Sequence, residues 1–204
     1  YIRYIIHKSM RFFKHIIIFL ALVIHPVLAN NHGPDDFLKA SVAEVMDFIT
    51  DNKSQLEQDD EYLITKMNEI VIPKLDIELM SRIVLGKNHW NNISISEKSD
   101  FMDAFKNLMV RTYMKSLTAF EGEKIKFLPY TQGKRDDVAK VKSIYLLNEG
   151  ELPVSYRLKK TDSKWRVYDI IIDGVSLLKN YRSDFKTHVK NKGILSLIDQ
   201  LNAN

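Results

Sequence analysis

Hydrophobic residues between positions 34 and 122 recur with the period of an α-helix. Apolar side chains three or four positions apart predict amphipathic helices, the first of which follows Pro34, a residue suited to an opening helical turn. A polar stretch at 53–59, Pro73 and Gly86 separate the helices. The apolar positions of the four predicted helices are Leu38, Val42, Val45 and Ile49; Leu63, Met67, Ile70 and Val71; those within 75–85; and Phe101, Phe105, Leu108, Tyr113, Leu117 and Phe120.

The fourth helix has clear end signals. Ser94 and Glu97 have the spacing of a capping box, which predicts that the helix begins there, and Gly122 predicts its end. Beyond Gly122 the pattern changes to short segments rich in β-branched and aromatic residues, with turn residues between them. Four such segments predict an antiparallel meander with strands at 124–130, 138–147, 153–160 and 165–172.

The helical period returns after Gly174, and Gly193 precedes a last short helix. Helices that are segregated from an antiparallel sheet are typical of an α+β domain. We therefore predict N-terminal and C-terminal helices packed on an antiparallel sheet of about four strands. The apolar positions of the two last helices are Val175, Leu178, Tyr181 and Phe185, then Leu195, Ile198 and Leu201.

Residues 1–29 have the layout of a secretory signal peptide. With Met10 as the true start, a short basic stretch precedes an apolar run that is shorter than a bilayer span of about 20 residues. Val27 and Ala29 suit a cleavage site. We expect residues 1–29 to be a signal peptide and residues 30–204 to form one exported domain. An uncleaved membrane anchor is the alternative.

The net charge of +4 originates in this first segment, which holds four basic residues and no acidic ones. The rest of the chain has 30 − 4 = 26 basic residues against 26 acidic ones. A neutral domain lacks the electrostatic footprint of a nucleic-acid-binding protein, and we expect no nucleic-acid partner. Because the chain has no cysteine, a disulfide framework, a thiolate zinc site and a cysteine nucleophile are excluded.

Residues suited to catalysis or metal binding are scarce. After residue 29 the histidines are His32, His89 and His188, and no pair has the spacing of helix ligands. Nucleophile-elbow, phosphate-loop and dinucleotide motifs are absent. Asp169 and Asp173 are close in sequence, but strand alternation and the following turn separate them. We expect no catalytic residue, no metal site and no cofactor.

Apolar residues are more prominent than any polar motif. The long helix presents Met102, Met109 and Met114 beside its aromatic side, and residues 170–172 are apolar on both faces of a strand. Flexible methionine side chains can line a pocket for an irregular apolar ligand. A filled hydrophobic core explains the same pattern. From the residues alone, the chain is an exported α+β domain with or without an apolar cavity.

Several stretches, in the same order, are similar to one known family. They are WRVYD at 165–169, DGVS at 173–176, NYR at 180–182 and Phe185, preceded by RIVLGKNHW at 82–90 and FKNLMVRTYMKSL at 105–117. The family that they resemble is MlaC, also called the toluene-tolerance or auxiliary periplasmic component of a phospholipid ABC transporter. The resemblance spans nearly all of residues 36–201.

The resemblance implies a periplasmic carrier, not an enzyme, whose cargo is a phospholipid with its acyl chains between helices and a curved sheet. It also implies transient contact with two membrane complexes. One is an MlaA-type outer-membrane lipoprotein with its porin, and the other is an inner-membrane ABC transporter with an MlaD-type MCE subunit. The function would be to maintain outer-membrane lipid asymmetry. The alternatives are an exported enzyme or small-ligand binder on an NTF2-like or cystatin-like scaffold, and a structural envelope adaptor with a filled core.

Apolar faces and the family's architecture together predict which residues line the cavity. The headgroup is expected to stay in solvent, and a Leu108→Trp change is expected to fill the cavity. Tyr113, Tyr156 and Tyr181 are candidates for hydroxyls at the mouth, and Arg111, Arg157 and Arg182 for contacts with a phosphate or a partner. The predicted lining consists of Val84, Leu85, Phe105, Leu108, Met109 and Tyr113 from the helices, and Val141, Tyr145, Tyr156, Val167, Ile170, Ile172, Val175 and Leu178 from the sheet and the helix after it.

Overall fold

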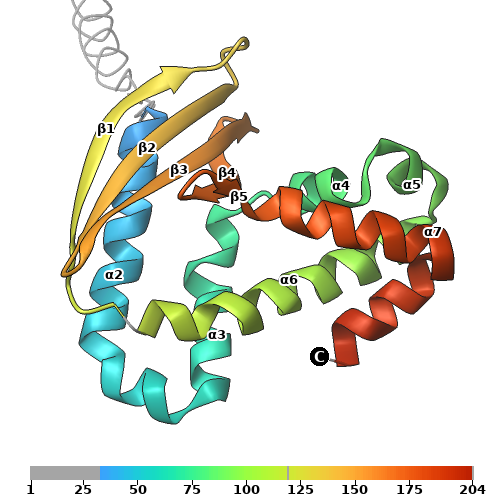
Figure 1. The fold of residues 1–204 in the computed structure, drawn as a ribbon, viewed down its shortest axis with the longest axis horizontal. Coiled ribbons are helices and arrows are strands. Elements are labelled where there is room, and N and C mark those ends of the chain that lie inside the picture. The colour runs from blue at the N-terminus through green and yellow to red at the C-terminus, as the bar shows by residue number, and fades with distance from the viewer. Residues whose placement is uncertain (1–32, 119, 204) are drawn as a thin grey trace, which may run out of the picture. The chain divides into compact units, whose positions relative to one another are not determined.

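Helices precede and follow a five-stranded sheet in the computed structural model, which describes residues 33–118 and 120–203, with no side chains for 114–118 (Figure 1). The elements before the sheet are α2 (Pro34–Gln58), α3 (Asp60–Ile70), the 3₁₀ turn η1 (Ile72–Lys74), α4 (Ile77–Leu85), α5 (Lys87–Asn92) and α6 (Ile95–Thr118). They are followed by β1 (Lys124–Gln132), β2 (Val138–Leu147), β3 (Gly150–Thr161), β4 (Lys164–Ile172), β5 (Val175–Ser176) and α7 (Leu177–Ala203). The signal peptide expected at residues 1–29 lies outside the described residues.

The sheet is an antiparallel meander, as the turn signals predict. Its strands pair in sequence order, β1-β2-β3-β4-β5, and each pair is antiparallel. Asp162 and Ser163 form the tight β3–β4 turn with φ values of 50° and 62°, which suit the twist of a two-residue hairpin. The α+β fold class is therefore confirmed, and the two-residue strand β5 adds to the four predicted strands.

Caps at helix starts agree with the sequence pattern. Glu97 accepts a hydrogen bond from the Ser94 amide at 2.8 Å, and the Ser94 hydroxyl accepts one from the Glu97 amide at 3.2 Å, which completes the predicted capping box of α6. Asp59 caps α3 and Asp76 caps α4 through their carboxylates. These side chains satisfy amide groups that would otherwise lack partners, and so they determine where the helices begin.

Two helical segments differ from the prediction. The polar stretch at 53–59 was expected to interrupt the pattern, yet α2 continues to Gln58 because Leu56 is buried while its polar neighbours face solvent. The short helix α5 was not predicted, because its sequence KNHWNN has a single buried apolar residue, Trp90, and therefore no helical period.

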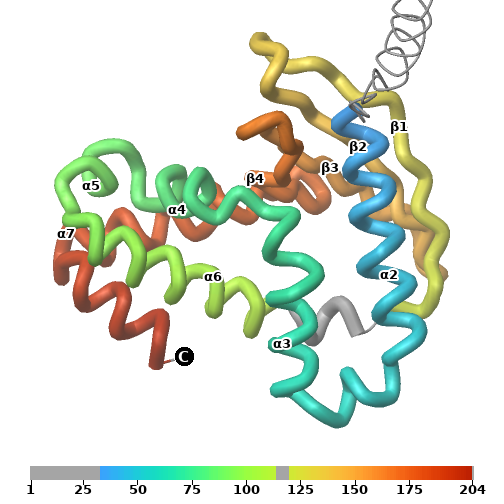
Figure 2. Tube along the Cα trace, turned by 180° about the vertical axis from the view of Figure 1, so that it is seen from behind, coloured from blue at the N-terminus to red at the C-terminus, as the bar shows by residue number. Residues whose placement is uncertain are grey.

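Three hydrophobic clusters hold the elements together. One joins α4, α5, α6 and α7 around stacked and edge-on rings of Phe101, Phe105 and Phe185. A second packs the start of α2 against the sheet, and a third joins α2, α3 and α6. Seen from behind, α2 and α3 run antiparallel to each other, with α2 beside β1 and β2 (Figure 2). The clusters meet around the space described next.

The last helix is kinked at Gly193, as the glycine predicts. Gly193 has φ +82° and ψ 171°, a conformation that is essentially restricted to glycine. The kink directs Leu197, Ile198 and Leu201 into the helical cluster. Arg111 secures this end by donating a hydrogen bond to the Leu201 carbonyl at 2.6 Å. Arg111, a candidate for phosphate contact, therefore binds the backbone of α7.

Candidate functional site

A cavity of about 400 Å³ lies between the sheet and the helices. Its walls come from α2, the η1 region, α4, α6, strands β2, β3 and β4, and the first turn of α7. Almost all of its lining is apolar. The lining residues are Leu38, Ser41, Val42, Val45, Met46, Val71, Ile72, Lys74, Leu75, Met80, Met109, Val110, Tyr113, Tyr145, Leu152, Val154, Tyr156, Val167, Ile170, Ile172, Leu177 and Leu178.

Strand alternation explains the sheet side of the cavity. Alternate residues of β3 face it, and their partners on β4 face it too, because paired residues point to the same side of a sheet. The pairing shifts by one residue between Arg157 and Leu158, which leaves Tyr168 as the extra residue on β4. Val167, rather than Tyr168, therefore continues the cavity face beyond Ile170.

Helical periodicity explains the opposite side. Leu38, Ser41, Val42, Val45 and Met46 of α2 all line the cavity. Their spacing of three and four positions places them on one face of the helix. The sequence pattern identified three of them as the apolar side of a helix, but it assigned none of them to the cavity.

Three tyrosines add hydroxyl groups to the apolar wall. The Tyr145 and Tyr156 hydroxyl oxygens are 2.8 Å apart, and Tyr181 donates a hydrogen bond to the Tyr113 hydroxyl at 3.3 Å. Burial raises the pKa of Tyr113, Tyr145 and Tyr156, so that all three are neutral at physiological pH. Tyr181 does not line the cavity; its ring packs against Phe105 in the helical cluster.

The structure brings together a little over half of the residues that were predicted to line the cavity. They come from α6, from strands β2 to β4 and from the start of α7. They are Met109, Tyr113, Tyr145, Tyr156, Val167, Ile170, Ile172 and Leu178.

The other six predicted residues lie outside the lining of this cavity. Val84, Leu85 and Phe105 are buried in the helical cluster, and Leu108 packs against it. On α6, Leu108 is rotated by one position from Met109, so the two side chains meet different surroundings. A Leu108→Trp change would therefore add bulk beside the helical cluster.

The two remaining residues of that set belong to the sheet. Val141 is fully buried in the cluster between the sheet and the start of α2. Val175 on β5 is 51% exposed. Val141 is apolar and lies in a predicted strand, so the sequence could not separate it from the cavity wall. Val175 was predicted as an apolar position of a helix, but it lies on β5, before α7 begins.

Lys74 is the one charged side chain in the lining, among the residues that the structure describes. Its ammonium group forms an ion pair with Glu44 of α2, with 2.8 Å between Nζ and Oε2. The sequence analysis missed Lys74, because its partner is 30 positions away and no local motif connects them.

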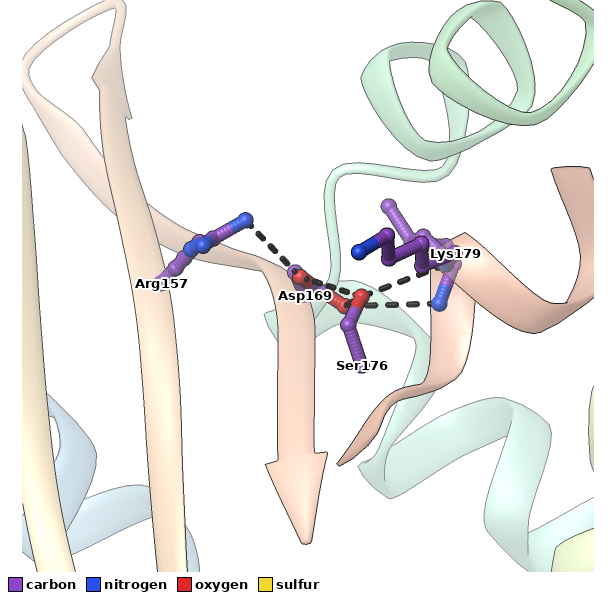
Figure 3. A network of polar contacts seen from close by, with 5 residues as sticks. Arg157, Asp169, Ser176 and Lys179 are labelled. Carbon is purple, nitrogen blue, oxygen red and sulfur yellow. Dashed lines mark hydrogen bonds and ion pairs between the residues drawn. The ribbon is translucent and has the colours of Figure 1, made fainter. Parts of the chain in front are cut away.

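A buried carboxylate fixes the start of α7 beside the cavity (Figure 3). Asp169 is 2% exposed and accepts hydrogen bonds from the Ser176 hydroxyl at 2.8 Å and from the Leu178 amide at 3.4 Å. Arg157 approaches it from β3 at 3.2 Å. Ser176 also caps α7 by accepting a hydrogen bond from the Lys179 amide. Asp169 is therefore structural, and Arg157, another candidate for phosphate contact, pairs with it.

A second pocket, of about 490 Å³, lies between α4 and the β1–β2 turn. It is lined by Arg82, Lys134, Arg135 and Lys159 together with apolar residues and Tyr168. The described residues of both linings include no histidine and no carboxylate. Within residues 33–118 and 120–203, no three metal-ligating side chains are grouped to hold an ion.

Over the same described ranges, no helix combines the length and the hydrophobicity that a bilayer crossing requires.

Comparison with known proteins gives matches over most of the chain. The family model described as "MlaC protein" matches residues 39–203. The intermembrane phospholipid transport system binding protein MlaC of Haemophilus influenzae is 22% identical over 173 residues, which cover 83% of this chain and 80% of that protein. The toluene tolerance protein ttg2D of Pseudomonas putida is 23% identical over 162 residues, with coverage of 78% and 74%.

A solved structure shares the fold. The phospholipid-binding protein from Ralstonia solanacearum, determined in complex with a phospholipid, superimposes with a TM-score of 0.75 at 23% identity. The likeness covers 82% of this chain and 93% of that one.

Proposed function

Because the chain belongs to the MlaC family, whose model matches residues 39–203, we propose that it is a carrier that transfers phospholipid between membranes. The observation that carries this proposal is the apolar cavity of about 400 Å³ between sheet and helices. A phospholipid is named as the ligand of the protein that shares this fold, and phospholipid transport is named as the function of a relative.

The energetics of the cargo explain why such a cavity is needed. Each methylene group removed from water contributes about 0.8 kcal/mol, so two chains of roughly 16 carbons represent on the order of 25 kcal/mol. An acyl chain can leave a bilayer at a useful rate only if its new surroundings are nearly as apolar. The strand and helix faces around Ile170, Val154 and Val42 offer such surroundings.

The lining supports a carrier over the two alternative functions. An enzyme needs convergent groups for acid–base or nucleophilic chemistry, and the described residues that line the cavity include no histidine and no carboxylate. A purely structural adaptor needs a filled core, and this domain has an open space at its centre instead. The transport energy would come from a partner transporter.

The location and the partners extend the same proposal. The carrier works in the periplasm, after removal of residues 1–29 as a signal peptide, with residues 30–204 as the lipid-binding domain. It exchanges lipid with an MlaA-type lipoprotein–porin complex at the outer membrane and with an MlaD-type MCE subunit at the inner membrane. Its role is to maintain outer-membrane lipid asymmetry. The name of the Haemophilus influenzae relative, which places it in an intermembrane phospholipid transport system, supports this assignment.

Analysis of the co-purified lipid tests the proposal. The protein is purified without detergent, extracted with organic solvent and analysed by mass spectrometry. We expect phospholipid in a reproducible molar ratio to protein, whereas a control protein purified in parallel yields none. Recovery of no phospholipid from the folded protein would contradict the proposed function.

A further inference from the structure

The cavity is apolar except along one edge. Lys74 contributes its side chain to the lining, and that side chain is only 19% exposed. A lysine has a long aliphatic stem, which can cover an apolar wall while the ammonium group stays at the boundary with solvent. Lys74 therefore places a positive charge where the apolar space meets water.

The counter-ion of Lys74 comes from a second element of the cavity wall. Glu44 lies on α2, and its side chain is 60% exposed. Lys74 belongs to η1, so the ion pair connects two elements that both contribute to the cavity wall. Ser41, one helical turn before Glu44, also lines the cavity. We refer to Ser41, Glu44 and Lys74 as the polar edge.

Among the residues that the structure describes, the rest of the lining offers no second charge. The tyrosines on the sheet and on α6 are neutral, because burial raises the pKa of Tyr113, Tyr145 and Tyr156. An apolar space with a single cation at its boundary is complementary to an amphiphile whose apolar chains adjoin one anion. A lysine ammonium group has three donors and binds phosphate as a point charge.

We propose that the phosphate group of the carried phospholipid binds at the polar edge. There the phosphate contacts Lys74 and replaces Glu44 as its counter-ion. This inference rests on the proposed function. Glu44 can leave easily, because its side chain is mostly exposed and regains water when released. Lys74 then has an anionic partner in both the empty and the loaded protein, and the Ser41 hydroxyl can donate to the same phosphate. The remainder of the headgroup stays in solvent.

A charge-removing variant tests this site with two matched lipids. Lys74→Met keeps an unbranched stem in the wall and removes the charge. The probes are dipalmitoylphosphatidylglycerol and dipalmitoylglycerol, which have the same chains and differ in the anionic phosphoglycerol headgroup. We expect Lys74→Met to weaken binding of the phosphatidylglycerol about tenfold and to leave dipalmitoylglycerol unchanged. Glu44→Gln, which removes the competing anion, should strengthen phosphatidylglycerol binding severalfold.

Controls separate charge from folding. Lys66→Met removes a comparable cation on α3, which pairs with Glu69 and does not line the cavity. It should change neither affinity. Lys74→Arg keeps the charge and should retain most of the affinity for phosphatidylglycerol. Thermal unfolding of each variant shows that it is folded before binding is measured.

Three outcomes would overturn the inference. If Lys74→Met lowers the affinity for both lipids equally, only the aliphatic stem of Lys74 contributes to binding. If it changes neither affinity, the charge of Lys74 does not contribute to binding. Glycerol 3-phosphate has the anion without the chains; if its binding depends on Lys74 while phosphatidylglycerol binding does not, the site binds a free anion. If the wild-type protein binds neither lipid, the proposed function itself fails.

Discussion

Ile170 and Leu108 are apolar residues of similar size in different surroundings. Ile170 on β4 lines the cavity, whereas Leu108 on α6 packs against the helical cluster. A tryptophan ring introduced at position 170 enters the open space of the cavity. The same ring introduced at position 108 must displace packed side chains of the helical cluster. Two substitutions of the same bulk can therefore distinguish cavity volume from core packing.

We predict that Ile170→Trp lowers the amount of bound phospholipid severalfold and reduces the free energy of unfolding by less than about 1 kcal/mol. Lipid is measured by mass spectrometry after solvent extraction, and stability by urea unfolding. Leu108→Trp is the matched control, which should keep its lipid and lose about 1–3 kcal/mol from overpacking. If Leu108→Trp loses its bound phospholipid and Ile170→Trp keeps it, the lipid binds among the helices and not in the cavity beside the sheet.

At the scale of elements, one buried carboxylate determines where α7 begins. Asp169 of β4 binds the hydroxyl of Ser176 and the amide of Leu178, and Arg157 of β3 approaches the same carboxylate (Figure 3). Four elements are therefore connected through one side chain. Because Leu178 lines the cavity, this network also determines one part of the cavity wall.

Ser176→Ala is expected to lower the free energy of unfolding by about 2 kcal/mol. The change removes a hydrogen bond to a buried charged acceptor and the cap of α7. Arg157→Gln is the comparison, with an expected loss below about 1 kcal/mol because the arginine side chain is 48% exposed. Urea unfolding measures both. Equal losses for the two variants would mean that the exposed arginine stabilises the network as much as the serine does, which would contradict this prediction.

At the scale of the whole described domain, the cavity is small for its proposed cargo. A methylene group occupies about the volume of one water molecule, roughly 30 Å³, so the cavity of about 400 Å³ holds about 13 methylene groups. That is close to one acyl chain, and a lipid with two chains needs more than twice this space. We infer that α2 and the η1–α4 region separate when such a lipid enters.

Spin labels can measure this separation, because the chain has no cysteine of its own. Labels at Ala43→Cys on α2 and Glu78→Cys on α4 should report a longer distance with dipalmitoylphosphatidylglycerol and little change with a single-chain lysophospholipid. A control pair at Glu78→Cys on α4 and Lys186→Cys on α7 joins two helices of one hydrophobic cluster and should not change with either lipid. An unchanged distance in the first pair, with two-chain lipid bound, would contradict the expansion.

The local structure of this protein could be predicted from its sequence because local interactions determine it. The Ser94–Glu97 capping box, the turn at Asp162 and Ser163 and the kink at Gly193 each depend on residues a few positions apart. The order of the strands follows from the short turns between them. The similarity to the MlaC family was also readable in the sequence, since it rests on the order of short motifs.

The existence of the cavity and the identity of its lining residues depend on how the elements pack in three dimensions. Periodicity shows which face of a helix or strand is apolar, but the same pattern suits a filled core and an open space. Leu108 and Met109 are adjacent, apolar and in contact with the same helical cluster, yet only Met109 also lines the cavity, because successive side chains of a helix point about 100° apart. The pairing of Lys74 with Glu44, 30 positions apart, likewise exists only after α2 and η1 come together.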